Sequence, residues 1–498
     1  MHADLKNGWC GIILDVNLTT GSITRCQLDR DDVRLFLGGR GLNAKTLFDR
    51  VPPGVDPLGP ENILCMAPGI LTATLLGLSS RLHVSTLSPY SGILGDGNAG
   101  GSFAYTLKRA GHDQIIISGQ ADTPLYLWID DDQVGLLSAD DLWGTSVWET
   151  TDRLTHGHGE DTSVACIGQA GENLVRLAST MVDKYASAAR GSGAVWGSKR
   201  LKAIVVRGSQ RVGLFDRKRF LSLAAADRKY LANDSVQREV AAVYGSHYGM
   251  VNWFPGFRNF QTELPGDAVP QALRPEAWKQ YEVGRSGCQS CHIKCKNRYE
   301  IPSGRRRGER GEALEYEAIY CMGTNCGIDD PVAIMEMENL ADLYGIDVIA
   351  IGNTWTCAIP LIWKADLWDG LAELLTAATG MAFSGTDIVD AADRIHAVER
   401  AFNIRQGITI DHDRLPQKPD IKYSPEGQRE RKDHVEMLRR YYQAHGYHPD
   451  TGIPLQATLD RLNIPDVGRQ IAADAPYAPW DGPPLWALDA YPSGGTRA

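Results

Sequence analysis

Three cysteines, Cys288, Cys291 and Cys295, stand close together in a CxxCxxxC arrangement. This spacing can turn three sulfurs toward one side of a loop or helical turn, and three thiolates on one loop suit a metal centre. A [4Fe-4S] cluster takes four cysteine ligands, usually a tight group and one remote residue. Zinc would instead accept the three cysteines together with His292. The motif favours an iron–sulfur cluster; zinc and three unligated buried thiols are the alternatives.

The fourth ligand of such a cluster would be a remote cysteine. Cys321, Cys326 and Cys357 all compete for this position, and their residue type and spacing do not decide among them. The reverse spacing, CxxxCxxC, is typical of radical-SAM enzymes, so this chain fits that class less well.

Four short segments in the N-terminal part of the chain are rich in glycine or join an arginine to small residues. Glycine permits positive φ and close backbone approach, so successive N–H groups can surround an anion, and Arg81 can supply a charged fork to a phosphate. Each segment taken alone favours a tight β-turn, but together they indicate loops that hold a phosphate-bearing cofactor. None forms a Walker A loop or a Rossmann fingerprint. The segments are residues 38–41, 79–81, 95–101 and 190–194.

Acidic residues follow the cysteines: Glu315 and Glu317 come first, and Asp342 and Asp347 come next. Carboxylates just after a metal-binding loop can transfer protons or accept hydrogen bonds from the amino groups of a heterocycle. The alternative is that they are ordinary acids on a helix surface or at helix caps.

The elements that must position these residues form a β-rich first part and a helical second part. Short apolar runs alternate with turn residues at 12–16, 115–117 and 203–206, and residues 125–137 are expected to form a hairpin. After Val212 the apolar residues follow helical periodicity. We expect an α+β fold with a β-sheet-rich domain at 1–211, a helical domain carrying the cysteine motif at 212–350, and a helical C-terminal domain at 351–498. The expected helices cover residues 219–231, 331–343, 371–378 and 388–402.

The composition excludes several classes of protein. The chain has 498 residues, of which 43% are hydrophobic, and no apolar run approaches the length of a membrane span. Its net charge of -10 opposes a nucleic-acid partner, which would require a basic surface. The N-terminus shows no export signal, so the cytoplasm is the expected location. Ten cysteines in such a chain are expected to be ligands or buried thiols rather than disulfides.

Taken together, the motifs resemble the aldehyde:ferredoxin oxidoreductase family of tungsten or molybdenum pterin enzymes. Their order and approximate spacing agree over about residues 8 to 350, and this combination is highly specific. The matching segments are residues 36–42, 55–62, 79–81, 87–89, 98–101, 110–113, 182–185, 197–199, 258–261, 288–295, 315–317 and 342–347.

The resemblance implies an N-terminal β domain that forms the base for a bis-pterin cofactor. Helical domains would close over it, and a nearby [4Fe-4S] cluster would exchange electrons with ferredoxin. A magnesium ion bridging the pterin phosphates would be held by the backbone of Asn98 and Ala188, and Glu315 would lie near the metal as the proton-transfer residue. The implied cofactor-binding residues are Arg81, Asn98, Gly100, Ala188, Arg190, Asp342 and Asp347.

The chain also departs from the family pattern. About 100 residues of the family are missing between Ile351 and Leu371, including the segment with a substrate-side histidine. The distance from Cys357 to Gly380 is close to that following the family's fourth cluster cysteine, so the resemblance favours Cys357 as the fourth ligand. Ser187 stands where the family usually has arginine, which weakens the case for two standard pterins.

The expected function is therefore a tungsten- or molybdenum-pterin oxidoreductase. It would oxidise aldehydes or reduce the corresponding acids and pass electrons through a [4Fe-4S] cluster to ferredoxin or a partner subunit. One alternative keeps the cofactor but reduces aromatic thioesters, as ring-reducing subunits of the family do. The other is a non-catalytic, cluster-bearing electron-transfer subunit. The choice of metal, the number of pterins, the natural substrate and the oligomeric state are left open by the sequence.

Overall fold

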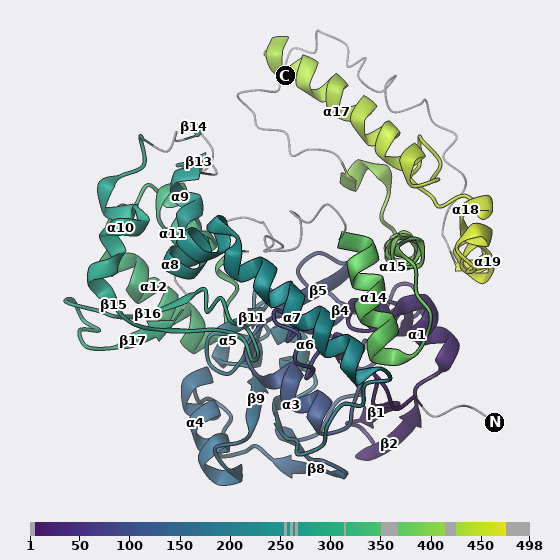
Figure 1. Cartoon of the computed structure of the whole chain (residues 1–498), viewed down its shortest axis with the longest axis horizontal. Coiled ribbons are helices and arrows are strands. Elements are labelled where there is room, and N and C mark those ends of the chain that lie inside the picture. Colours follow the sequence, from purple (N-terminus) through teal and green to yellow (C-terminus); the bar gives the residue numbers. More distant parts are fainter. Residues whose placement is uncertain are drawn as a thin grey trace, which may run out of the picture. The chain divides into compact units, whose positions relative to one another are not determined.

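The structure, a computed structural model, is formed by two compact units (Figure 1). The first contains residues 1–47 and 56–388, and the second contains residues 48–55 and 389–498. The division into three domains at 211 and 350 stays a prediction. None of the helices formed by the described residues combines the length and hydropathy that a membrane span needs. The residues described are 5–252, 256–258, 262–263, 267–312, 315–349, 367–413 and 425–474.

A six-stranded sheet with the order β2-β1-β6-β3-β4-β5 begins the first unit. Its parallel pair is β1 with β6, and the other neighbouring strands are antiparallel. The strands expected at 12–16 and 115–117 are confirmed as β1 and β6. The strands are β1 (Ile12–Asn17), β2 (Ser22–Gln27), β3 (Leu64–Pro68), β4 (Leu82–Leu87), β5 (Leu94–Ala99) and β6 (Gln114–Ser118).

Strand β5 corrects the expectation that residues 95–101 form a loop, because residues 94–99 pair with β4 along their whole length. The glycines serve close packing here. A Cβ atom on Gly97 would lie 2.6 Å from the carbonyl carbon of Ala188, so only glycine lets this strand approach the neighbouring chain segment. Only Gly101, beyond the strand, has the positive φ (89°) that the loop interpretation required.

A second six-stranded sheet has the order β11-β10-β9-β12-β7-β8. The hairpin expected at 125–137 is confirmed as β7 and β8, and the strand expected at 203–206 lies within β12. The strands are β7 (Leu125–Asp130), β8 (Gln133–Ser138), β9 (Ser163–Cys166), β10 (Thr180–Val182), β11 (Ala186–Ala188) and β12 (Leu201–Arg207).

Both sheets share one hydrophobic core, which includes Leu64 and Ile115 from the first sheet and Ile204 from the second. Phe103 of helix α3 and Trp196 of helix α6 are fully buried in the same core. Each such side chain contributes about 1.5–3 kcal/mol through the apolar surface it removes from water. The helices associated with this part are α1 (Arg30–Phe36), α2 (Arg40–Arg50), α3 (Phe103–Arg109), α4 (Val147–His158), α5 (Gln169–Glu172) and α6 (Ser192–Ser198).

The chain after residue 212 is mainly helical, as expected, but it contains a three-stranded antiparallel sheet that the helical periodicity did not predict. This sheet flanks the cysteine motif. The helices expected at 219–231, 331–343 and 371–378 are confirmed within α7, α12 and α14. The elements of this part are α7 (Arg217–Asn233), α8 (Ala242–Tyr244), α9 (Gly249–Asn252), β13 (Gly256–Phe257), β14 (Thr262–Glu263), α10 (Pro275–Trp278), β15 (Glu282–Ser286), β16 (Lys296–Glu300), β17 (Arg310–Glu312), α11 (Tyr316–Met322), α12 (Pro331–Tyr344) and α14 (Leu367–Thr379).

The second unit is helical in its described residues. The helix expected at 388–402 is confirmed within α15, and the Arg405 guanidinium near its end lies 4.7 Å from the centre of the Phe48 ring. Phe402 and Val398 of the same helix are fully buried. The helices are α15 (Gly385–Arg405), α17 (Pro425–Ala444), α18 (Gln456–Arg461) and α19 (Pro465–Asp474).

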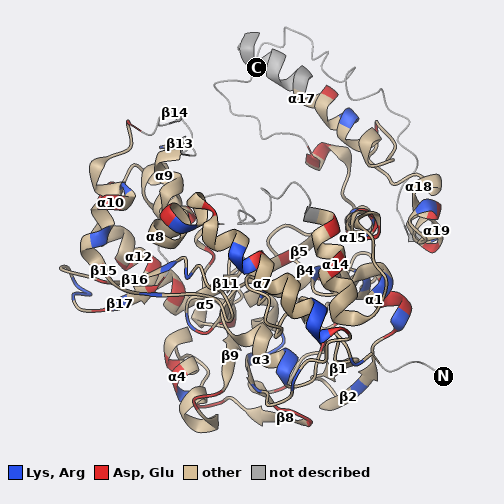
Figure 2. Cartoon of the chain, viewed as in Figure 1, with Lys and Arg blue, Asp and Glu red and all other residues tan. Residues whose placement is uncertain are grey.

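Lys and Arg are interleaved with Asp and Glu along the described elements, and α7 carries both kinds of charge (Figure 2).

Candidate redox-cofactor site

The cysteine motif lies in the loop between β15 and β16. Its backbone turns sharply, since Ser290 and Lys294 have positive φ values of 64° and 50°. The Cys291 N–H donates to the Cys288 carbonyl at 3.0 Å. The Cys291 sulfur accepts backbone N–H groups from Ile293 and Lys294, although burial outweighs them and raises the pKa of this thiol. Amide donors aimed at a sulfur stabilise negative charge on it, which is what a metal-bound thiolate requires.

Arg81 connects this loop to the first sheet. Its Nη2 donates to the Asn98 carbonyl oxygen at 3.1 Å, its Nε donates to the Asn98 side chain, and its Nη1 lies 3.9 Å from the Cys288 sulfur. A Cβ on Gly100 would lie only 2.5 Å from that sulfur, so glycine is what lets the strand end and the cysteine loop approach each other. The guanidinium can therefore contact an anion and a cluster ligand together.

A polar network on β4 and β5 orients Asn98. The Asn98 amide nitrogen lies 2.9 Å from His83 Nε2, and His83 Nδ1 lies 3.0 Å from the Asp96 carboxylate. Burial would raise the pKa of Asp96, but His83, Arg40 and Ser85 outweigh it and lower this pKa. The carboxylate is thus held ionised beneath Asn98.

Other predicted phosphate-contacting residues lie next to Asn98. Ala188 packs against Gly97 of β5, and its carbonyl oxygen accepts the Ser192 hydroxyl at 2.8 Å. Arg190 has a positive φ of 70° at the start of the turn into α6, and its carbonyl oxygen accepts the Ser88 hydroxyl at 2.6 Å. The structure thus brings Arg81, Asn98, Gly100, Ala188 and Arg190 into one region of the first unit.

Helix α12 supplies the carboxylates of the site. The Asp330 side chain caps its first turn, and Gly345, with a φ of 71°, ends it. Glu338 and Asp342, four residues apart on one face, are 7% and 5% exposed. Within the described part of the chain, Glu338 Oε2 and Asp342 Oδ2 have no hydrogen-bond partner. Buried acceptors left in this state fit a bound group with N–H donors.

Burial and repulsion between these acids both raise their pKa values. Burial and the nearby Glu315 raise the pKa of Glu317 to about 7, and burial with Glu315 and Glu317 raises that of Glu338 to about 8. Burial and Glu338 also raise the pKa of Asp342 well above its usual range. Glu315 occupies the N-cap position of α11. Such carboxyl groups can exchange protons near neutral pH.

Asp347 follows the end of α12, where its backbone N–H donates to the Leu177 carbonyl at 3.0 Å. Its carboxylate accepts the Ile349 N–H at 2.9 Å. This fixes Asp347 against the segment that leads into β10.

Lys296 and Glu312 belong to the same region but were not singled out from the sequence. The Lys296 ammonium lies 3.2 Å from Glu312, and burial would lower its pKa, but Glu312, Cys288 and Glu315 outweigh burial and raise it. Lys296 therefore connects the cysteine loop electrostatically to the carboxylates. The signal available in the sequence was only its position directly after Cys295.

Within the described residues, no three His, Cys, Asp or Glu side chains are grouped so that they could hold a metal ion. Cys357, the predicted fourth cluster ligand, lies outside the described residues. Of its competitors, Cys326 is exposed and Cys321 is buried. Burial, with Glu317 and Asp347 nearby, raises the pKa of Cys321.

Comparison with known families matches both parts of the chain. Residues 13–208 match the aldehyde ferredoxin oxidoreductase N-terminal domain, and residues 223–367 and 361–464 match aldehyde ferredoxin oxidoreductase domains 2 and 3. The chain belongs to the aldehyde ferredoxin oxidoreductase family.

Among characterised relatives, the chain is 37% identical over 366 residues to a tungsten-containing aldehyde ferredoxin oxidoreductase of Pyrococcus furiosus, a match covering 72% of this chain and 60% of that protein. The corresponding protein of Thermococcus kodakarensis is 37% identical over 367 residues, with the same coverages. A WOR-like subunit of an aliphatic sulfonate oxidoreductase from Pyrococcus furiosus is 31% identical over 365 residues, covering 69% of this chain and 58% of that protein. The chain thus matches less than two thirds of the length of these relatives.

The fold is also similar to a chain of the active-site complex BamBC of benzoyl coenzyme A reductase, solved with 1,5-dienoyl-CoA. The TM-score is 0.80 at 21% identity, and the match covers 94% of this chain and 99% of that chain. This likeness confirms the expected α+β architecture.

Proposed function

We propose that this chain is a tungsten- or molybdenum-pterin oxidoreductase. It oxidises aldehydes, or reduces the corresponding acids, and passes the electrons through a [4Fe-4S] cluster to ferredoxin or an electron-transfer subunit. The observation that carries the proposal is the position of Arg81, which contacts both Asn98 and the sulfur of Cys288. A predicted phosphate-binding residue and a predicted cluster ligand thus share one guanidinium.

The pterin-bound metal supplies the two-electron chemistry when it is present. The chain's own residues bind and orient it. Arg81, Asn98, Gly100 and Arg190 would hold the phosphate region, and the backbone of Asn98 and Ala188 would help hold a magnesium ion, which prefers oxygen ligands. Asp342 and Asp347 would contact one pterin. The buried Asp342 Oδ2, which lacks a partner among the described residues, supports this role.

Glu315 is the proposed proton-transfer residue. Its charge, together with burial, raises the pKa values of Glu317 and Glu338. A general acid or base works best when its pKa is near the working pH, and the carboxyl groups around Glu315 satisfy this condition.

Cys288, Cys291, Cys295 and Cys357 are the proposed cluster ligands. Cys321, which the resemblance does not favour, is buried with Glu317 and Asp347 nearby. The Cys326 thiol forms a hydrogen bond instead: it donates to the Cys321 carbonyl at 3.2 Å.

Specific observations favour two alternative functions. Reduction of aromatic thioesters is favoured by the likeness in fold to the benzoyl coenzyme A reductase complex and by the shortened segment between Ile351 and Leu371. A non-catalytic electron-transfer subunit is favoured by the same shortening but opposed by retention of the residues assigned to the pterin.

Elemental analysis of anaerobically purified protein tests the proposal. We expect about four iron atoms per chain with one tungsten or molybdenum and detectable pterin. Iron without tungsten, molybdenum or pterin would reject the enzyme and leave the electron-transfer subunit. If the pterin metal is found, electron-acceptor reduction with aldehydes and with aromatic thioesters as separate substrates distinguishes the two enzymatic functions.

A further inference from the structure

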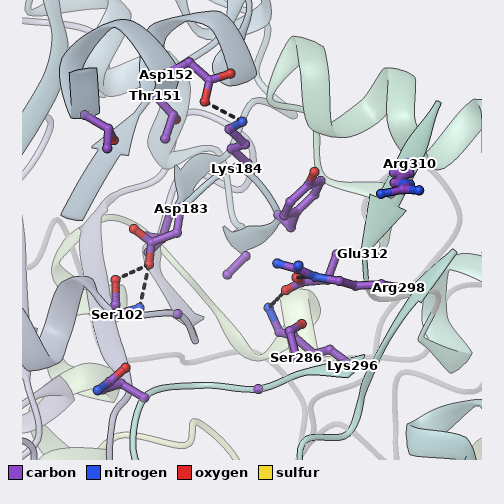
Figure 3. Close-up of a pocket in the computed structure, with 18 of the residues that line it drawn as sticks. Ser102, Thr151, Asp152, Asp183, Lys184, Ser286, Lys296, Arg298, Arg310 and Glu312 are labelled. Atoms are coloured by element: carbon purple, nitrogen blue, oxygen red, sulfur yellow. Dashed lines mark hydrogen bonds and ion pairs between the residues drawn. The ribbon is translucent and has the colours of Figure 1, made fainter. Parts of the chain in front are cut away.

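A cleft of about 580 Å³ lies in the first unit, beside the cysteine loop (Figure 3). Helix α4 and the turn between β10 and β11 form one wall, and strands β15, β16 and β17 form the other. Its volume falls in the range of pockets that bind small organic molecules. The lining residues, all in the described part of the chain, include none of those assigned above to the pterin or to the cluster.

The charges of the cleft favour an anion. Its lining contains four basic residues, Lys184, Lys296, Arg298 and Arg310, against the acids Asp152, Asp183 and Glu312. One carboxylate serves two of the cations, because Glu312 lies 3.2 Å from both Lys296 and Arg298. The paired acids therefore do not neutralise the cations one for one.

The carboxylate of Asp183 is already engaged by hydrogen-bond donors. Its carboxylate accepts the Ser102 N–H at 2.5 Å, the Ser102 hydroxyl at 2.7 Å and the Val164 N–H at 3.4 Å, so its oxygens are turned toward these donors (Figure 3). Burial also raises its pKa.

The cations that reach the open side of the cleft are the arginines. The side chain of Arg298 is 56% exposed and that of Arg310 is 69% exposed, and the latter lies 3.0 Å from Glu300, outside the lining. Lys184 approaches from the opposite wall, held 2.6 Å from Asp152. Guanidinium groups bind carboxylate and phosphate oxygens through two parallel hydrogen bonds.

Tyr185 adds an uncharged donor and an aromatic surface. Its ring packs edge to face with Trp148 at 5.4 Å. Burial, with Glu312 and Asp342 nearby, raises its pKa to about 12, so the hydroxyl keeps its proton at neutral pH. A ligand with a small organic frame and an anionic group would find both kinds of contact here.

We propose that this cleft is a binding site for a small organic anion, a carboxylate or a phosphate ester, whose oxygens are held by Arg298, Arg310 and Lys184. The site also adjoins the cysteine loop. Gly287 and Gln289, which flank Cys288, line it, and the Gln289 N–H donates to the Gly101 carbonyl at 3.1 Å. The backbone that carries Cys288 therefore forms part of the cleft's lining.

Isothermal titration of the full chain tests the site, with inorganic phosphate and succinate as separate probes and chloride replacing them at constant ionic strength. We expect saturable one-site binding of at least one probe. The double variant Arg298→Gln/Arg310→Gln should weaken it at least tenfold, because two charge-assisted hydrogen-bonding groups are removed. Both side chains are exposed, so the variant is expected to fold normally.

Arg307→Gln is the matched control, since Arg307 is an exposed arginine near β17 that does not line the cleft. It should bind the probes as the natural chain does. Binding of phosphate alone identifies a phosphate ester as the ligand, and binding of succinate alone identifies a carboxylate. No saturable binding of either probe, or equal binding by the double variant and the control, overturns the proposal. The titration does not depend on redox activity, so its failure and that of the proposed enzyme are distinguishable.

Discussion

The two sheets and helix α12 both bury charged side chains, but they treat them differently. Around the sheets two buried lysines are paired with acids: Lys108 lies 2.5 Å from Asp113, and Lys202 lies 2.5 Å from Glu172. On α12, Glu338 Oε2 and Asp342 Oδ2 are buried without a partner in the described part of the chain. Buried ion pairs belong to the structure of the fold, whereas buried acids that repel one another are typical of a functional site.

The difference separates structural from functional charge. Asp113 also accepts the backbone N–H groups of Cys10 and Gly11 at 2.8 and 2.7 Å, so it joins the start of β1 to the turn after α3. Lys199 is held by the carbonyls of Asn62 and Gly119, and burial lowers its pKa to about 8. Changes at these positions should reduce stability, and changes near α12 and the cysteine loop should alter the bound groups or the chemistry.

The largest effect is expected at the cluster. Cys357→Ala should remove most of the iron and the EPR signal, because a [4Fe-4S] cluster with three remaining thiolates is labile. Cys326→Ala serves as the control and should keep both. Iron retained in the first variant and lost in the second would reassign the fourth ligand to Cys326.

Lys108→Met should reduce the free energy of unfolding by about 3–5 kcal/mol, because it leaves Asp113 buried without its counter-charge. Chemical denaturation measures this change. Arg153→Met removes an exposed ion pair with Glu149 and should cost about 0.5 kcal/mol or less. Equal losses in the two variants would show that the buried pair is not structural.

Glu315→Gln should slow turnover by about 100-fold, since general acid–base catalysis typically contributes that much or more. Its metal and iron contents should match those of the natural chain, which elemental analysis checks on the same sample. Unchanged turnover would remove Glu315 from the mechanism and weaken the contrast between the two regions.

A pH-dependent gain in stability is expected for Glu338→Gln. The folded-state pKa of Glu338, raised to about 8, lies above its usual 4.5, so the natural chain loses stability as the pH rises between these values. The variant removes this loss. Relative to the natural chain, it should be more stable at pH 8 than at pH 5. Glu276→Gln, at an exposed position, should show no such difference. If Glu338→Gln and the natural chain differed in stability by the same amount at both pH values, the buried-acid interpretation would be contradicted.

Local sequence patterns predicted much of the fold. The hairpin at 125–137 and the helices α7, α12 and α14 followed from alternating or helical apolar periodicity and were confirmed. The segment 95–101 was mistaken for a loop because glycine in a sequence marks both positive φ and close packing. Only the neighbour on the other side, Ala188, shows which one applies to Gly97.

The sequence by itself determined the class of the site: the CxxCxxxC motif, the arginine before β4 and the acids after the cysteines are local features whose chemistry can be read without coordinates. Only the tertiary structure decided which of these groups meet. It brought Arg81 to Cys288 across 207 positions of the chain, and it placed Lys296 and Glu338 among the predicted site residues. The reason is physical: contacts between distant segments, and the pKa shifts that burial causes, depend on how the elements pack, and no local spacing encodes them.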